Sequence, residues 1–299
     1  MSKSVFTSST GTAAWTPRPA ATVVVLRDGR AGPEVFMVRR HKGTAFMGGA
    51  HVFPGGGVDA GDREAANPRW CSGIDEAASH LADLAPAEAI AYHVAAAREL
   101  FEEAGVLLAR DADGRFVSFA GDAERARIAQ DRRDVHGGGL ALRDIVEREG
   151  LRLALDVLVP FAHWVTPPID VRQFDTRFFA TRVPEQQAAA HDDTETTESV
   201  WITAAEAIAR CRADEMVLPP PTWTTLREIE RFRAVDEVIA WAHQRRVVRR
   251  EPRLVEQAGT KMLLLPGDPL NPDRTSQPPV AETRFVLRDG HWRAEPART

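Results

Sequence analysis

Cysteine is scarce in this chain of 299 residues, which contains only Cys71 and Cys211. The two lie in different segments and lack metal-ligand spacing, so we expect free thiols, with neither a disulfide framework nor a cysteine-based zinc site. Long hydrophobic runs are also missing, and the Ser/Thr-rich amino terminus has no apolar centre. The sequence therefore predicts neither a membrane span nor a secretory signal, and cytoplasmic is the expected location.

An excess of positive charge is missing as well. Lysine and arginine number 38 against 43 aspartates and glutamates, which gives a net charge of -5 and a pI near 6.0. Proteins that bind nucleic acids or membrane surfaces without specificity need a positive field at the contact face, so both kinds of partner are disfavoured. We expect a small-molecule partner and a monomer or homodimer.

What is present is a chain with 43% hydrophobic residues, enough for a substantial core. After residues 1–17, a predicted flexible leader, the apolar run 21–26 predicts a buried strand that ends at Asp28-Gly29. Residues 34–40 predict a second strand paired with it. Residues 50–53 predict a short third strand, which Pro54 and three glycines end.

The rest of the chain alternates between helices and strands. Pro86 and Gly105 bound the best defined helix, at about 86–104. The other predicted elements are strands at 106–108, 157–166, 173–182, 199–202 and 261–265, helices at 122–150 (interrupted at 137–139), 204–212 and 221–245, and a hairpin around Asp289-Gly290. This order predicts an α+β protein with a mixed sheet between helices.

Three carboxylates mark the end of the helix predicted at 86–104. Residues three and four apart share a helix face, so Glu99, Glu102 and Glu103 lie within one turn. Two unit charges about 4 Å apart repel by roughly 4 kcal/mol at an effective dielectric constant near 20. The cluster therefore needs a cation or raised pKa values, and oxygen ligands suit Mg²⁺ or Mn²⁺. Arg98, four residues before Glu102, can orient one carboxylate.

A glycine run precedes this helix in the sequence, at Gly55, Gly56 and Gly57. Glycines let backbone N–H groups approach phosphate oxygens, or let the strand turn and lie against the helix. The context favours a metal site over the alternative of a solvated acidic helix face. A dinucleotide-binding fingerprint is disfavoured because the segment after Ala60 runs into Asn67-Pro68 and opens no long helix.

The residues resemble the Nudix box, G-x5-E-x7-R-E-U-x-E-E-x-G-U, in which U is aliphatic. Gly56-x5-Asp62 resembles its first half and Arg98 to Val106 match its second half. Asp62 replaces the first glutamate, and 35 residues stand where the box has seven. The peroxisomal coenzyme A diphosphatases of mammalian type carry an insertion at this place. Further similar segments are 46–47, 50–56, 164–167, 172–179 and 265–268.

The resemblance implies a Nudix-type α/β/α sandwich with a helical insertion inside the Nudix box and a C-terminal helical extension. We expect the Nudix domain at 18–265, the insertion at 63–85, and an extension at 266–299 that holds the hairpin. The resemblance also implies metal-dependent hydrolysis of a diphosphate linkage. Glu99, Glu102 and Glu103 would bind Mg²⁺ or Mn²⁺. Glu195 is the predicted carboxylate from outside the box, with Glu198 as the second choice.

The implied substrate is coenzyme A or acyl-CoA, cleaved to 3′,5′-ADP and phosphopantetheine. We expect substrate contacts from Arg40, Gly55, Gly56, Gly57 and Trp164, with Arg39, Arg172 and Arg177 as further candidates for phosphate. Ala45 stands where the coenzyme A signature has arginine. ADP-ribose, NADH or a dinucleotide are alternative substrates. A non-catalytic nucleotide sensor is an alternative class, disfavoured because a binder needs no metal-activated water.

Overall fold

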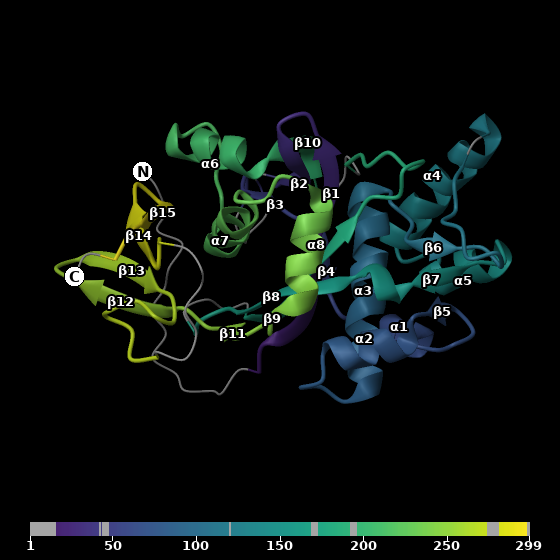
Figure 1. Cartoon of the computed structure of the whole chain (residues 1–299), viewed down its shortest axis with the longest axis horizontal. Helices are drawn as coiled ribbons and strands as arrows, with labels where there is room; N and C mark the ends of the chain where they lie inside the picture. Colours follow the sequence, from purple (N-terminus) through teal and green to yellow (C-terminus); the bar gives the residue numbers. More distant parts are fainter. Residues whose placement is uncertain are drawn as a thin grey trace.

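A central mixed sheet organises the protein. The computed structural model describes residues 16–41, 43, 48–119, 121–168, 173–191, 196–273 and 281–297. Within these residues the sheet has strand order β10-β2-β1-β9-β8-β11, with β3 added to β2 and β4 added to β1. Strand β1 (Arg18–Gly29) pairs antiparallel with β2 (Gly32–Arg40) through a tight turn and parallel with β9 (Phe174–Arg182) (Figure 1).

The remaining elements are further strands of the central sheet, two small sheets and the helices. Its other strands are β3 (His51–Val52), β4 (Gly55–Gly57), β8 (Val159–Val165), β10 (Thr196–Thr203) and β11 (Arg249–Arg250). Two small sheets hold β5 (Cys71–Ser72), β6 (Ala109–Arg110) and β7 (Arg152–Ala154), and β12 (Arg253–Gln257), β13 (Thr260–Leu264), β14 (Arg284–Arg288) and β15 (His291–Glu295). The helices are α1 (Ala60–Ala65), α2 (Ile74–His80), α3 (Pro86–Ala104), α4 (Asp122–His136), α5 (Leu142–Arg148), η1 (Leu155–Val157), α6 (Ala204–Arg212), α7 (Pro220–Ile229) and α8 (Val235–Gln244).

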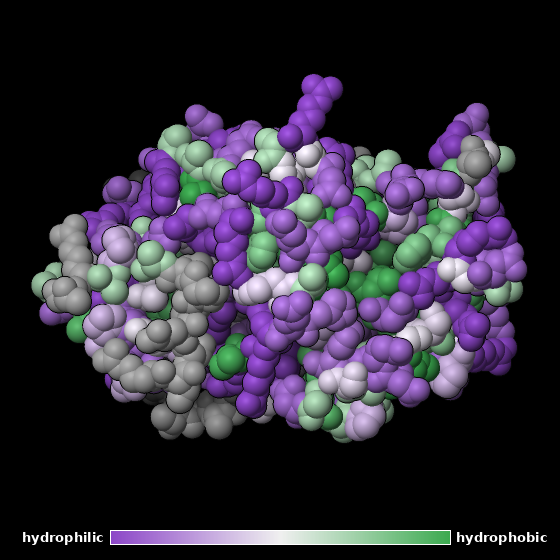
Figure 2. All heavy atoms as spheres, in the orientation of Figure 1, coloured by the Kyte–Doolittle hydropathy of each residue, from purple (hydrophilic) through white to green (hydrophobic). Residues whose placement is uncertain are grey.

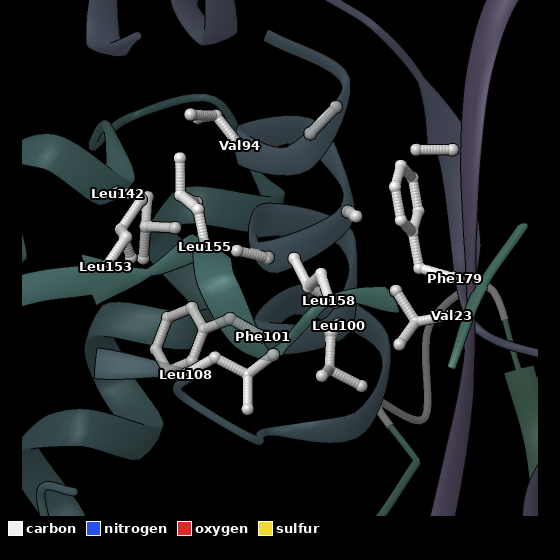
Figure 3. Close-up of a cluster of buried hydrophobic side chains, with 14 of the residues drawn as sticks. Val23, Val94, Leu100, Phe101, Leu108, Leu142, Leu153, Leu155, Leu158 and Phe179 are labelled. Carbon is white, nitrogen blue, oxygen red and sulfur yellow. The ribbon is translucent and has the colours of Figure 1, made fainter. Parts of the chain in front are cut away.

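Helices cover both faces of the central sheet, as the predicted α/β/α sandwich requires. Val23 of β1 packs into the core on the α3 side, whereas Val24 packs into the core with α6, α7 and α8. Because both faces are buried, β1 has a continuous apolar run in place of alternation. Figure 3 shows Val23 and Phe179 of the sheet facing Leu100 of α3. The α+β fold class is confirmed.

Two predicted elements are wrong. Residues 106–108 form no strand but a buried connection, in which the Gln187 side chain bonds both Leu107 N and Leu107 O. A side chain thus supplies the partners that a neighbouring strand would provide. The helix predicted at 221–245 is two helices, α7 and α8, separated at 230–234. The apolar spacing continues through the break because Phe232 still packs against the same core.

The inserted segment and the C-terminal hairpin follow the prediction, whereas the helical character expected for the extension at 266–299 is wrong, because its described residues hold β14 and β15 and no helix. Residues 63–85 are partly helical, as expected, and α4 and α5 flank the predicted interruption at 137–139. Strands β14 and β15 form the predicted hairpin, with Asp289 and Gly290 in the left-handed region at φ 50° and 81°. Their sheet includes β13, which pairs with β14, so it joins residues on both sides of the boundary predicted at 265. The leader predicted at 1–17 lies almost wholly outside the described residues.

The surface is mainly polar. Figure 2 shows a face on which hydrophilic atoms predominate and hydrophobic atoms are scattered among them. Within the described ranges, none of the helices combines the length and apolarity needed to cross a bilayer.

Candidate active site

Helix α3 carries the predicted carboxylates in its last two turns. It spans Pro86–Ala104, with Pro86 in the first turn, and it ends at Gly105, which has φ 70° and donates its N–H to Phe101 O at 2.9 Å. Proline at the start fits a position without a hydrogen-bond partner, and glycine adopts the left-handed conformation that ends the helix. Residues 98–103 are therefore helical, which is the condition for Glu99, Glu102 and Glu103 to share one helix turn.

Arg98 connects the two halves of the interrupted box. Its Nη1 donates to Glu99 Oε1 at 2.8 Å and to Glu102 Oε1 at 2.9 Å. Its Nε and Nη2 donate to the two oxygens of Asp62 at 2.8 and 3.0 Å, and Nη2 also donates to Gly57 O at 2.8 Å. The guanidinium group thus holds two helix carboxylates against the segment that follows the glycine run.

Asp62 is fixed from both sides. Its side chain is 2% exposed, and its Oδ2 also accepts the N–H of Asp59 at the start of α1 at 2.8 Å. Helix α1 packs against α3, so the intervening residues loop away and leave Asp62 beside Arg98. The aspartate that replaces the expected glutamate therefore still pairs with the arginine of the box.

The glycine run lies directly against the carboxylates. Gly55 donates its N–H to Glu103 Oε2 at 2.9 Å. A Cβ at Gly56 would stand 2.4 Å from Glu99 Oε1, closer than real contacts allow. Glycine at position 56 therefore leaves room for the Glu99 carboxylate between α3 and β4. Of the two roles predicted for the run, the structure shows the close packing of strand on helix.

Burial raises the free-energy cost of keeping the carboxylates of this cluster ionised. Desolvation raises the pKa of Glu99 to about 7, with Arg98 opposing the shift and Glu102 adding to it. Glu102 and Glu103 are also buried, and His136 Nδ1 lies 3.6 Å from Glu102 Oε2. Buried carboxylates that repel one another fit a divalent cation, which would favour their ionised forms. In the described residues, no three His, Cys, Asp or Glu side chains are already arranged around one point to enclose an ion.

Other predicted contact residues lie elsewhere. Trp164 is 3% exposed and packs in the core on the face of the sheet opposite α3, with Arg250 over its ring at 5.5 Å. It is not brought to the carboxylates, and burial leaves it no open face on which a base could stack. Arg40 ends β2, and its Nε is buried without a hydrogen-bond partner. Arg177 is buried, and both of its terminal nitrogens are bonded to Asp83.

Of the two candidates for the carboxylate from outside the box, only Glu198 lies within the described residues. Glu195 lies outside the described residues, as does Arg172. Glu198, the second choice, is in β10, and its Oε2 accepts from Arg39 Nη1 at 3.1 Å. His136 and Arg132, which contact Glu102, were not predicted from the sequence. No motif marks them, because they meet α3 only through the packing of α4.

A carboxylate helix of this sequence, beside a glycine strand in an α/β/α sandwich, defines a Nudix hydrolase, an enzyme that acts on diphosphate bonds. The family model described as NUDT19 Nudix domain matches residues 11–231. The chain therefore belongs to the NUDT19 Nudix family.

Similar proteins come from animals and from a bacterium. The protein named acyl-coenzyme A diphosphatase NUDT19 from Homo sapiens is 28% identical over 297 residues, covering 86% of this chain and 77% of that one. Its namesake from Gallus gallus is 28% identical and covers 80% and 73%. The crystal structure of a Nudix hydrolase from Alicyclobacillus acidocaldarius has a TM-score of 0.63 and 29% identity, covering 76% of this chain and 97% of that one. The fold agrees with the sequence-based assignment.

Proposed function

We propose that this enzyme hydrolyses the diphosphate of coenzyme A or acyl-CoA and releases 3′,5′-ADP and phosphopantetheine or its acyl derivative. The observation that carries the proposal is the complete set of helix carboxylates, of which Arg98 holds Glu99 and Glu102 and Gly55 holds Glu103. The names of the animal relatives support the choice of substrate. The intact carboxylates favour an enzyme over a nucleotide sensor, because binding alone needs no activated water.

Glu99, Glu102 and Glu103 would hold the divalent cation, Mg²⁺ or Mn²⁺. A bound ion of this kind neutralises charge on phosphate oxygens and lowers the pKa of a coordinated water. The protein supplies the geometry for it. Arg98 fixes one oxygen each of Glu99 and Glu102, and Gly55 fixes one oxygen of Glu103. Preorganised ligands lose little conformational entropy on binding, and their carboxylate oxygens suit a hard ion.

The substrate groups outside the diphosphate have fewer assigned contacts. Arg40 remains our proposal for a phosphate contact, because its buried Nε has no hydrogen-bond partner and an anion would satisfy it. Glu195 remains our proposal for the further carboxylate. A cytoplasmic location and a monomeric or homodimeric state stay predictions from the sequence.

The decisive experiment is product identification by mass spectrometry with Mg²⁺ or Mn²⁺ present. Coenzyme A, an acyl-CoA, ADP-ribose, NADH and a dinucleoside polyphosphate are assayed side by side. We expect 3′,5′-ADP from the first two substrates at the highest kcat/KM. Preferred turnover of ADP-ribose or NADH would overturn the substrate assignment. No turnover on the whole panel, with Glu103→Gln binding nucleotide as tightly as wild type, would favour the sensor.

A further inference from the structure

Helix α4 packs against the end of α3 that carries the carboxylates. Arg132 and His136 are four residues apart near the end of α4, so they share one face of that helix. Both contact Glu102. Arg132 Nε donates to Glu102 O at 2.8 Å, and His136 Nδ1 lies 3.6 Å from Glu102 Oε2.

Glu102 is consequently held through its backbone and its side chain. Arg98 Nη1 bonds Oε1 at 2.9 Å from within α3, and His136 faces Oε2 from α4. Arg132 fixes the carbonyl oxygen. With one carboxylate oxygen bonded by Arg98, the other facing His136 and the backbone carbonyl bonded by Arg132, Glu102 has little freedom to rotate away from a bound ion.

The contact with Arg132 also places a positive charge at the C-terminal end of α3. The last turn of α3 has no basic residue, although its final carbonyl groups carry partial negative charge. Arg132 supplies the missing positive charge from the neighbouring helix α4. Its Nη2 donates at 2.9 Å to the carbonyl oxygen of Ala190, whose N–H bonds Ala104 O at 2.9 Å. The end of α3 is thus bridged to α4 and to the segment before β10.

Gly105 makes room for this bridge. A Cβ at that position would stand 3.0 Å from Arg132 Nη1, and φ is 70°. Glycine therefore serves both the end of α3 and the close approach of the guanidinium group.

We propose that Arg132 and His136 are positioning residues, supplied by α4, that fix Glu102 for the divalent cation. The inference rests on the proposed metal-binding role of Glu102 and names the residues that control its geometry. Neither residue takes part in the chemical step. Their loss should weaken ion binding and lower turnover at limiting ion, with little change in the KM for substrate.

The test measures Mn²⁺ binding to the full chain by electron paramagnetic resonance, beside kcat, KM and the melting temperature. The variants are Arg132→Gln, Arg132→Lys and His136→Asn. We expect Mn²⁺ affinity to fall about 10-fold in Arg132→Gln and His136→Asn. Arg132→Lys should recover part of the loss, and kcat should recover at saturating Mn²⁺. Arg133→Gln is the matched control, because Arg133 hydrogen-bonds Gln130 on the same helix.

Wild-type Mn²⁺ affinity in Arg132→Gln and His136→Asn would overturn the inference, whatever happens to the melting temperature. Glu102→Gln, measured in parallel, separates this failure from a failure of the metal assignment. If Glu102→Gln weakens Mn²⁺ binding but the α4 variants do not, only the positioning role fails. If the α4 variants weaken Mn²⁺ binding while the wild type does not cleave coenzyme A, the positioning role stands and the substrate proposal fails. Should Arg132→Gln not fold, Arg132→Lys and His136→Asn decide the question.

Discussion

Arg98 donates hydrogen bonds to both carboxylate oxygens of Asp62, at 2.8 and 3.0 Å, although the two residues are 36 positions apart in the sequence. The pair restores in space a motif that the inserted segment interrupts in the chain. Because Asp62 is shorter by one methylene than the glutamate of the box, the close packing of α1 on α3 is what lets it reach the guanidinium group.

Asp62→Asn should destabilise the protein, because it removes the negative charge of one of the three carboxylates that Arg98 bonds and leaves only Glu99 and Glu102 beside the buried guanidinium. Removing one partner of an isolated buried ion pair costs about 3–5 kcal/mol, and the loss here should be smaller because Glu99 and Glu102 still pair with Arg98. Urea unfolding measures the loss, and kcat should fall as Glu99 and Glu102 lose a fixed Arg98. Asp59→Asn is the control, because Asp59 is 74% exposed and 3.7 Å from Arg98. Its effect should stay within about 1 kcal/mol, and equal effects of the two changes would contradict the role given to Asp62.

Gly56→Ala should abolish most activity while the fold persists. The added methyl group would stand 2.4 Å from Glu99 Oε1, so either the carboxylate or β4 must shift. We expect kcat to fall by at least about 100-fold, since a 1 Å misplacement can cost that much. Gly61→Ala adds the same methyl group where nothing lies within 4 Å, and it should leave kcat unchanged. Full activity in Gly56→Ala would show that the approach of strand to helix is unimportant.

Removal of divalent ions should stop turnover and lower thermal stability. Glu99, Glu102 and Glu103 are mutually repulsive, and an ion that binds only the folded state stabilises it by mass action. Dialysis against EDTA followed by scanning calorimetry measures both effects, with readdition of Mg²⁺ or Mn²⁺ as the reversal. Glu99→Gln should show a smaller rise in melting temperature on readdition. If EDTA treatment changed neither the melting temperature nor the rate of turnover, the metal site would be excluded.

Acid should destabilise the protein partly through His93, which is completely buried. Desolvation lowers its pKa to about 4, whereas an unfolded histidine has a pKa near 6.5. The unfolded state therefore binds more protons between pH 4 and 6.5, so stability is full above this window and falls as the pH drops through it.

The slope from one such group approaches about 1.4 kcal/mol per pH unit. Urea unfolding at pH 4.5, 5.5 and 7 measures it, and His93→Gln should flatten the profile. His51, whose pKa burial also lowers to about 4, should retain part of the dependence in that variant. An unchanged profile in His93→Gln would refute the assignment.

The sequence predicted the elements whose signals are local. Helix α3 matches the prediction at both ends, because proline, alanine and the terminal glycine act on neighbouring residues. The spacing of Glu99, Glu102 and Glu103 likewise needs only the helical repeat. The break between α7 and α8 was missed because apolar spacing reports which side faces the core and not whether the backbone continues.

The sequence by itself determined the class of fold and the carboxylate helix, since these follow from periodicity and side-chain chemistry within a few residues. Only the tertiary structure decided that Asp62 reaches Arg98, that Gly55 bonds Glu103, that Trp164 is buried on the far face, and that α4 contacts Glu102. Such contacts join segments distant in the chain, and they depend on how whole elements pack against one another.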